Sequence, residues 1–374
     1  MGNLPLIQNV ILSNNMNAAT IGLIWSNGAE LAKFLVDFVE PAKCYVRANP
    51  QDGTAIQDNT RNDFNELDFS KSKNRHAAIS QLQRLLKSII FILSETTSLG
   101  GSTLEDIGIT NETGLASDVD LSTTITIKNP DTSQKTREEK WFFVNGIGGE
   151  LFWLRYACDK LAAKYGREIT GIFNRGDSIL WDLRTDSSRK AQLVLKDQLK
   201  GPLEDNTKAP IVMIAYSQGC LLLRLALEEL LEDTDDDIQR VTQELVADTD
   251  DAIPKAMQIQ KAMKKRLYVF TFGNPSVDWN REKVPNGCSK ALSSYICCTE
   301  HFANTKDFVA KLGVLREDGV NGQNSGYPGS STIKNSNEDW AGHLFGAQYS
   351  LDACHYDNGP SSRLLACRPG QPIL

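Results

Sequence analysis

Short apolar segments alternate with amphipathic segments from about residue 140 onward. The apolar segments have the length and composition of buried strands, and the segments between them carry apolar residues at the three- and four-residue spacing of a helix. The pattern predicts strands at 141–145, 169–174, 211–216, 267–272 and 294–298, and helices at 151–165, 189–199 and 220–231. This alternation is typical of a parallel sheet flanked by helices, so we expect an α/β fold.

Two stretches interrupt the alternation. Residues 232–265 separate the last of these helices from the next strand and contain the acidic clusters 233–237 and 248–251. Charge of this kind predicts an acidic helical insertion, a solvated pair of surface helices. Residues 316–339 are rich in Gly, Asn and Ser, which predicts a long loop.

The first 139 residues follow a different pattern. Apolar residues at helical spacing mark one helix around 31–39 and another around 79–93, and polar stretches rich in Asn, Asp, Ser, Thr and Gly adjoin them. We therefore expect a largely helical extension over 1–139, ahead of an α/β domain over 140–374. The two helices would either pack against the main core or form a lid or cap, and packing is favoured because apolar stripes usually serve burial.

Composition and charge exclude several classes of protein. The chain has 374 residues, 47 acidic against 40 Lys and Arg, with a net charge of −7, so it lacks the basic surface that nucleic acid attracts. Its longest apolar run, 89–93, is far shorter than the roughly 20 residues that span a bilayer. The start of the chain lacks the pattern of a secretory signal. We expect a cytoplasmic protein with no transmembrane segment, and the sequence leaves membrane-surface contact and oligomeric state open.

The strongest motif is the junction between the strand at 211–216 and the helix after it. The segment Tyr-Ser-Gln-Gly at 216–219 joins a buried strand directly to a helix, which is the setting of a nucleophile elbow. An elbow lifts the serine hydroxyl clear of the sheet and needs small residues two before and two after it. Here these are Ala215 and Gly219. Ser217 is therefore the candidate nucleophile, although an ordinary helix N-cap would also fit this one motif.

Acyl transfer also needs hydrogen-bond donors for the oxygen that becomes negatively charged. The strand at 141–145 ends in a glycine-rich turn over 146–149. In elbow folds one donor is the amide after the nucleophile, and the other comes from the loop after an earlier strand. This predicts the amides of Gln218 and Ile147 as the oxyanion hole. A phosphate cradle is the alternative, but no Lys-Ser/Thr pair follows the glycines. No cofactor is predicted. No metal site is predicted either, and the cysteines lack zinc spacing.

A serine nucleophile needs a base and an acid that orients the base, and elbow folds place them in the chain order Ser, Asp or Glu, His. Asp307 lies just past the strand expected to carry the acid, and Asp278, one strand earlier, is its rival. His343 is expected at the start of a short helix and is the favoured base. His301 lies on the strand side, too close to the proposed acid, and His355 has no supporting pattern.

The order of these motifs resembles that of α/β-hydrolases of the lipase/esterase type. The segments that carry the resemblance to class 3 lipases are 215–219, 271–275, 304–309 and 342–343, and the Tyr-Ser-Gln-Gly elbow is also similar to that of cutinases. The resemblance covers about 141–349. It implies an α/β-hydrolase fold and a catalytic triad of Ser217, Asp307 and His343. The implied substrate is a small-molecule or lipid ester with a hydrophobic acyl group.

The sequence departs from that family at two positions and leaves two other functions open. Ala215 stands where the family has Gly, and Asn145 stands where a His often precedes the oxyanion glycine. An acyltransferase or thioesterase would use the same triad, and a binding protein could keep the fold with an inactive site. Asn174 lies in a segment similar to one in intracellular α/β-hydrolases, and we assign it no catalytic role.

Overall fold

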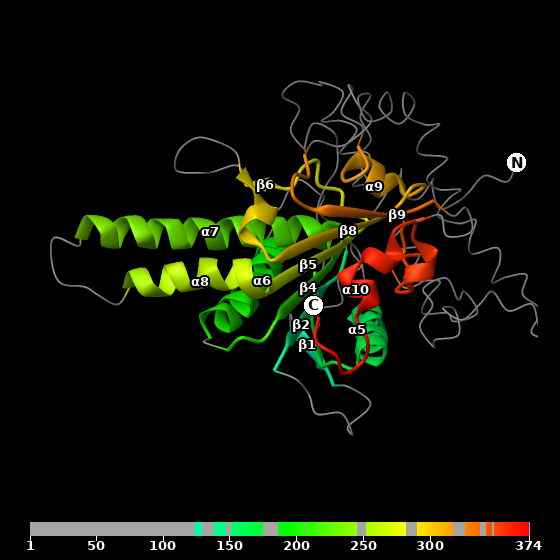
Figure 1. Cartoon of the computed structure of the whole chain (residues 1–374), viewed down its shortest axis with the longest axis horizontal. Coiled ribbons are helices and arrows are strands. Elements are labelled where there is room, and N and C mark those ends of the chain that lie inside the picture. Colours follow the sequence, from blue (N-terminus) through cyan, green and yellow to red (C-terminus); the bar gives the residue numbers. More distant parts are fainter. Residues whose placement is uncertain are drawn as a thin grey trace, which may run out of the picture.

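A seven-stranded sheet organises the part of the chain that the structure describes (Figure 1). The structure is a computed structural model and describes residues 124–128, 138–146, 151–174, 186–205, 207–244, 252–281, 290–316, 326–336, 342–345 and 348–373. Within these residues the predicted α/β class is confirmed, because the sheet is mainly parallel and helices flank it.

The strand order in the sheet is β1-β3-β2-β4-β5-β8-β9. The strands are β1 (Thr124–Ile127), β2 (Lys140–Val144), β3 (Ile169–Ile172), β4 (Ile211–Tyr216), β5 (Leu267–Phe272), β8 (Cys298–Asn304) and β9 (Ser331–Asn335). Every neighbouring pair is parallel except β1 and β3, which are antiparallel. Each residue of β4 and β5 is buried, which explains why both strands read as continuous apolar runs.

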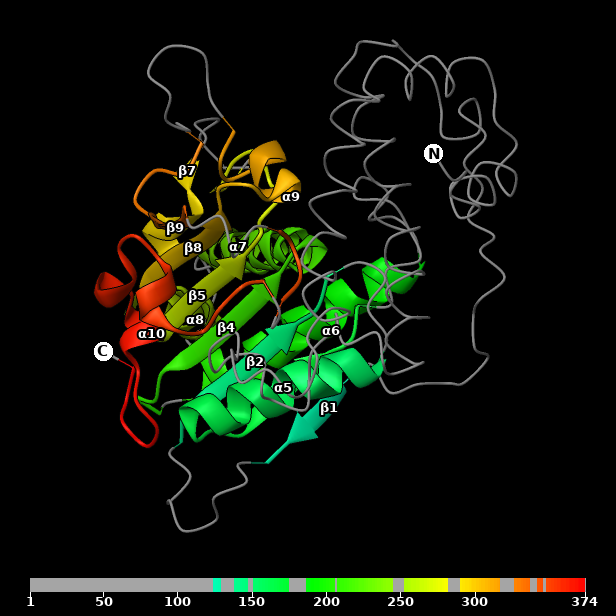
Figure 2. The same cartoon turned by 90° about the vertical axis from the view of Figure 1, so that its right-hand side faces the viewer.

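Helices cover both faces of the sheet (Figure 1, Figure 2). One face carries α5 (Leu151–Tyr165) and α10 (Arg363–Ala366), and the other carries α6 (Asp186–Glu204), α7 (Gln218–Glu244) and α8 (Ala252–Arg266). The shorter elements are α9 (Phe308–Leu312), the two-stranded pair β6 (Asn280–Arg281) and β7 (Lys290–Ala291), and the 3-10 helices η1 (Leu292–Tyr295), η3 (Ala353–His355) and η4 (Gly359–Ser361).

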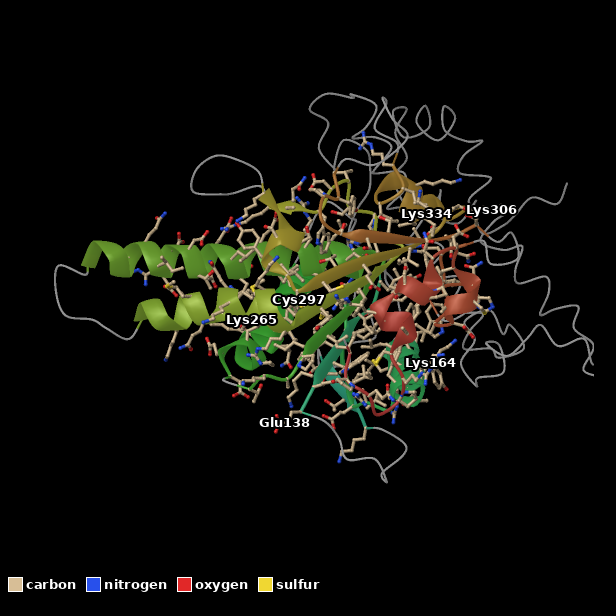
Figure 3. All side chains as sticks on the ribbon, viewed as in Figure 1. Glu138, Lys164, Lys265, Cys297, Lys306 and Lys334 are labelled. Atoms are coloured by element: carbon tan, nitrogen blue, oxygen red, sulfur yellow. The ribbon has the colours of Figure 1, made fainter. Side chains whose placement is uncertain are left out.

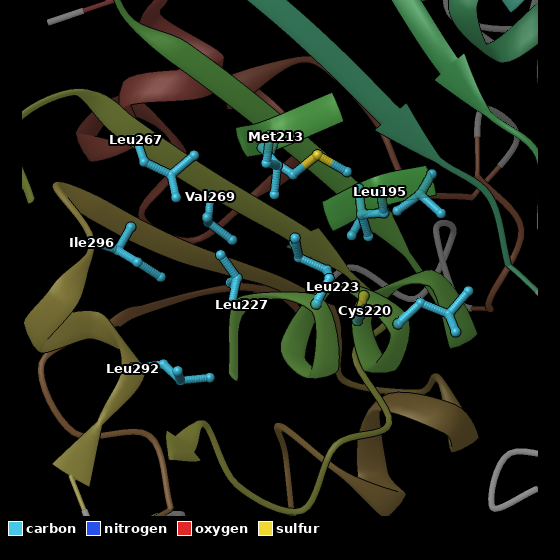
Figure 4. Close-up of a cluster of buried hydrophobic side chains, with 14 of the residues drawn as sticks. Leu195, Met213, Cys220, Leu223, Leu227, Leu267, Val269, Leu292 and Ile296 are labelled. Atoms are coloured by element: carbon cyan, nitrogen blue, oxygen red, sulfur yellow. The ribbon is translucent and has the colours of Figure 1, made fainter. Parts of the chain in front are cut away.

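The two faces hold separate hydrophobic cores, as the alternation of side chains along a strand requires. In β4, Val212 and Ile214 belong to the core under α5, and Met213 and Ala215 belong to the core under α6 and α7. Figure 4 shows the second core, where Leu223 of α7 packs with the strand residues. Charged side chains such as Glu138, Lys164 and Lys265 are exposed outside these layers (Figure 3).

The connections place a topological switch point between β2 and β4. Helix α5 follows β2 on one face, and α7 follows the neighbouring strand β4 on the other face. Helices that diverge in this way mark a topological switch point, where open α/β sheets bind ligands beyond the carboxyl ends of their strands. The carboxyl ends of β2 and β4 therefore mark the place to look for a functional site.

One predicted strand is displaced in the structure. Residues 292–295 form η1, and the strand expected at 294–298 instead spans Cys298–Asn304. The hydrophobic pattern did not predict β8, because the strand contains several polar residues. They are buried because they have partners: Glu300 accepts hydrogen bonds from the Ser362 hydroxyl and the Arg363 amide.

The predicted acidic insertion is only partly correct. Residues 232–244 continue α7 without a break, and α8 returns alongside it, so the two helices form a pair that projects beyond the sheet (Figure 1). The cluster at 233–237 is not merely solvated, because Asp235 pairs with Arg281 at 2.7 Å and Asp233 pairs with Lys196 at 3.0 Å. The cluster at 248–251 lies outside the described residues.

Two further segments differ from expectation. The loop predicted over 316–339 contains the edge strand β9, whose alternating exposed and buried residues give little apolar signal. The sheet also begins ahead of the expected boundary at residue 140, because β1 comes from the predicted N-terminal extension and pairs with β3. The helices expected around 31–39 and 79–93 lie outside the described residues. In the part of the chain that is described, every helix is too short or too polar to cross a membrane.

Candidate active site

Ser217 occupies the turn between β4 and α7 with a strained backbone. Its φ of 54° makes it the one non-glycine residue with a positive φ among those described, a conformation that L-residues adopt at a cost. The turn is held because the Ser217 amide donates to the Phe272 carbonyl at 2.9 Å, and the Ser217 carbonyl accepts from the Cys220 amide at 2.9 Å. A Cβ on Gly219 would lie 2.7 Å from the Asn145 carbonyl oxygen, so strand and helix approach closely only with glycine here. These are the features of a nucleophile elbow.

Ser217, His343 and Asp307 meet at the carboxyl edge of the sheet. The Ser217 Oγ lies 2.7 Å from His343 Nε2, and His343 Nδ1 lies 2.8 Å from Asp307 Oδ2. The three residues are buried. A neutral imidazole with its proton on Nδ1 satisfies both contacts. Its Nδ1 donates to the carboxylate, and its Nε2 accepts from the hydroxyl. The structure thus brings together the three residues that the sequence singled out.

Asp307 is fixed by more than the histidine. It caps α9, where its Oδ1 accepts from the Val309 amide at 2.9 Å. Its Oδ2 accepts from the Tyr349 hydroxyl at 2.6 Å as well as from His343. Both oxygens are therefore occupied, and a carboxylate held by several donors keeps one orientation.

A glycine allows the acid and the base to approach each other. Gly273 follows β5 with a φ of 57°. A Cβ at this position would lie 2.9 Å from His343 Cε1 and 3.0 Å from Asp307 Oδ2. These contacts are too close for a side chain, so Gly273 is required both for the backbone conformation and for the space.

The side-chain amides of Asn304 and Gln348 position the residues on either side of His343. Asn304, the last residue of β8, donates through Nδ2 to the Gly342 carbonyl at 2.8 Å and to the Gln348 carbonyl at 3.1 Å. The Gln348 side chain accepts from the Leu344 amide at 2.8 Å. His343 therefore lies in a turn that these side chains hold. The Gln348 backbone amide also donates to the Leu344 carbonyl at 2.9 Å. The helix expected from His343 onward runs through residues 346–347, which lie outside the described residues.

The predicted oxyanion hole is described in part. Gln218 is buried at the start of α7, and its side-chain oxygen accepts from Asn174 Nδ2 at 2.8 Å. Ile147 lies outside the described residues. The residue before it, Gly146, passes directly beside Ser217, since a Cβ there would lie 2.7 Å from Ser217 Cβ and 3.2 Å from Ser217 Oγ. The start of the segment after β2 therefore lies next to the Ser217 hydroxyl.

Sequence reasoning missed the polar network that supports this turn. The Asn145 side chain donates to the Gly146 carbonyl at 2.9 Å and to the Asn174 carbonyl at 2.9 Å, and it accepts from the Asn174 amide at 2.7 Å. Asn174, to which we assigned no catalytic role, thus joins the turn to Gln218. The available signal was an Asn at or just after the end of a buried strand, since carboxyl ends of parallel strands meet at one edge.

The rival candidates lie elsewhere in the structure. Asp278 lies 3.3 Å from Arg224 and accepts from the Asn280 amide at 3.0 Å. His355 Nδ1 lies 2.7 Å from the Ser350 hydroxyl. His301 is fully buried within β8, where its Nδ1 lies 2.6 Å from the Thr271 hydroxyl. These contacts give each rival a structural role.

Burial lowers the pKa of His301 to about 3, which predicts a pH-dependent stability. An unfolded histidine has a pKa of about 6.5, so between these values the unfolded chain binds a proton that the folded chain does not. Stability should therefore fall as the pH drops below about 6.5. From pH 7 to pH 5 this site should contribute a loss of about 2 kcal/mol in the free energy of unfolding, and His301→Gln should lack that loss. Urea titrations of both proteins at the two pH values measure it, and equal pH dependence in the two proteins would contradict it.

Comparisons with known proteins add no relative. A scan against protein-family models finds no match, and a search of curated proteins finds no match either. Within the described ranges no group of three or more His, Cys, Asp or Glu side chains could hold a metal ion. The contacts in the site are those of a hydroxyl next to a base that a carboxylate orients, an arrangement able to activate a nucleophile.

Proposed function

We propose that the protein is a serine hydrolase with an α/β-hydrolase fold that cleaves carboxylic esters through an acyl-enzyme on Ser217. The observation that carries the proposal is the unbroken hydrogen-bonded chain from the Ser217 hydroxyl through His343 to Asp307, at a strained strand-to-helix turn. A helix N-cap explains neither the strained backbone nor the imidazole at 2.7 Å.

In the first half of the proposed reaction, Ser217 attacks the ester carbonyl. His343 Nε2 takes the hydroxyl proton as the bond from Oγ to the acyl carbon forms, and the carbonyl electron pair moves onto oxygen. Asp307 stabilises the imidazolium through the Nδ1 contact. The amide of Gln218 would donate to the oxyanion, with Ile147 as the second donor expected from the sequence. Collapse of the intermediate breaks the bond to the alcohol oxygen, which leaves with the proton from His343.

In the second half, water replaces the alcohol. His343 takes a proton from water as its oxygen attacks the acyl carbon, and the second intermediate collapses to the acid. The proton returns to the Ser217 oxygen. The net reaction consumes one ester and one water and leaves the protein unchanged.

The setting of the triad supports this chemistry. The Tyr216 ring centre lies 5.1 Å from the His343 ring, and Phe345 packs against Tyr216 at 5.7 Å and against Phe272 at 5.2 Å. This apolar surround keeps bulk water from the imidazole, and hydrogen bonds between charged groups are stronger where water is excluded. The hydrophobic acyl group remains an expectation from the family resemblance.

The proposed function is tested with a series of aryl esters that differ in acyl chain length. The purified full-length chain should hydrolyse at least one member well above the buffer rate, with faster turnover for the more hydrophobic acyl groups. Added alcohol or thiol separates hydrolysis from transfer, because a transferase would divert acyl groups to the acceptor. Turnover no faster than buffer across the whole series would contradict the proposal.

A further inference from the structure

We propose that Tyr349 is a positioning residue for the proposed reaction: its phenol holds Asp307 in place and shares the charge of that carboxylate with His343. This inference rests on the proposed function of the triad and adds a fourth side chain to it. Tyr349 carries no motif that the sequence alone would have marked.

The geometry places two donors on one oxygen. The Tyr349 hydroxyl donates to Asp307 Oδ2 at 2.6 Å, and His343 Nδ1 lies 2.8 Å from the same atom. The phenol oxygen also accepts from the Asn304 amide at 3.3 Å. The Tyr349 ring is fully buried and packs edge-on against Phe272, with ring centres 5.8 Å apart. Packing and hydrogen bonds together leave the hydroxyl a single position.

The protonation state of the phenol makes it a donor. Burial raises the pKa of Tyr349 well above its ordinary value, and the nearby charge of Asp307 raises it further. The phenol therefore keeps its proton at any pH where the triad would work, and donation to the carboxylate is the contact it can make. Because Oδ1 is already bound to the Val309 amide, the phenol acts on the oxygen that faces the histidine.

Because the phenol donates to the same oxygen, the Asp307 carboxylate should stabilise the protonated form of His343 less strongly. A donor to a carboxylate withdraws part of its negative charge, and the neighbouring histidine then gains less from being protonated. Loss of the phenol hydroxyl should thus raise the pKa of His343. Among the described residues, the titratable groups facing Tyr349 are Asp307, His343 and Tyr356, and His343 also faces Ser217 and Tyr216.

Tyr356 offers a matched control. Its ring is buried and packs edge-on against Phe302, with ring centres 5.4 Å apart, and its hydroxyl donates to the Ser350 carbonyl at 2.9 Å. Tyr349→Phe and Tyr356→Phe each remove one buried hydroxyl and the hydrogen bond that it donates. Only the first of these bonds ends on the triad.

The test measures the pKa of His343 and the pH dependence of the triad in three proteins: wild type, Tyr349→Phe and Tyr356→Phe. Nuclear magnetic resonance titration of the histidine ring gives the pKa without any substrate. The rate of labelling by a fluorophosphonate, followed against pH, gives the second profile. Tyr349→Phe should raise the His343 pKa and move the acid limb of the labelling profile upward by about half a pH unit or more, roughly a threefold change in proton affinity. Tyr356→Phe should leave both unchanged.

A second change guards against a variant that fails to fold. Replacement of Tyr349 by 3-fluorotyrosine keeps the ring and the hydroxyl but makes the phenol a stronger donor, so the His343 pKa should fall. The inference is overturned if neither change at position 349 moves the His343 pKa, or if Tyr356→Phe moves it equally. Failure of the proposed function would look different, because the wild-type protein would then take no label at any pH while the histidine titration still reports on Tyr349.

Discussion

Replacing Ser217 with alanine should lower kcat/KM for ester hydrolysis by about 10³-fold or more. The physical reason is that the Ser217 hydroxyl is the group that contacts His343 Nε2, at 2.7 Å. Without this hydroxyl, catalysis would rest on substrate binding and oxyanion donors alone. Steady-state rates with the best ester of the series measure the loss.

The matched control for this change is Ser276→Ala. Ser276 is a buried serine just beyond the end of β5, and its loss should leave kcat/KM close to wild type. Thermal unfolding of both variants shows that each is folded. Hydrolysis by Ser217→Ala within tenfold of wild type would show that the hydroxyl is not the nucleophile.

Replacing His343 with alanine should cost about as much as replacing Ser217, because members of a triad act as a unit. The hydroxyl would remain but would have no group to take its proton. The double variant with Ser217→Ala should be no slower than Ser217→Ala alone, and Asp307→Asn should cost as much or less. Measured kcat/KM values for the single and double variants give this comparison directly.

The control for the base is His355→Ala. His355 lies against the Ser350 hydroxyl at 2.7 Å and should be dispensable for turnover. Near-normal turnover in His343→Ala together with a large loss in His355→Ala would show that the base is His355 and not His343. Unchanged turnover in Asp307→Asn together with lost turnover in Asp278→Asn would likewise show that the acid is Asp278, after the earlier strand.

The central sheet could be predicted from sequence because helices cover both its faces. Strands β4 and β5 are buried along their whole length, so they appear as continuous apolar runs, and α5 has the bounds 151–165 expected from its spacing. The edge strands β1 and β9 were not predicted, because a half-exposed strand needs few apolar residues. Strand β8 was displaced because its buried Glu300 and His301 have polar partners within the fold.

The triad was predictable because each member follows a strand in a fixed order along the chain. The geometry around it was not predictable, because it depends on contacts that tertiary packing sets. Tyr349 contacts Asp307, and Asn304 contacts the backbone next to His343. Asn145 and Asn174 illustrate the same limit. Each stands at or just after a strand end, which the sequence shows, but their mutual hydrogen bonds join residues 29 positions apart. No local pattern specifies that these two side chains pair with each other.

The most direct measurement of the central claim is covalent labelling of the wild-type chain with a fluorophosphonate, with the modified residue located by mass spectrometry. A serine activated by an adjacent base reacts with this reagent, whereas an ordinary buried serine does not. We expect one label, on Ser217, that is absent from Ser217→Ala and strongly slowed in His343→Ala. A wild-type protein that takes no label, or takes it at a residue other than Ser217, would contradict the claim that Ser217 is the nucleophile.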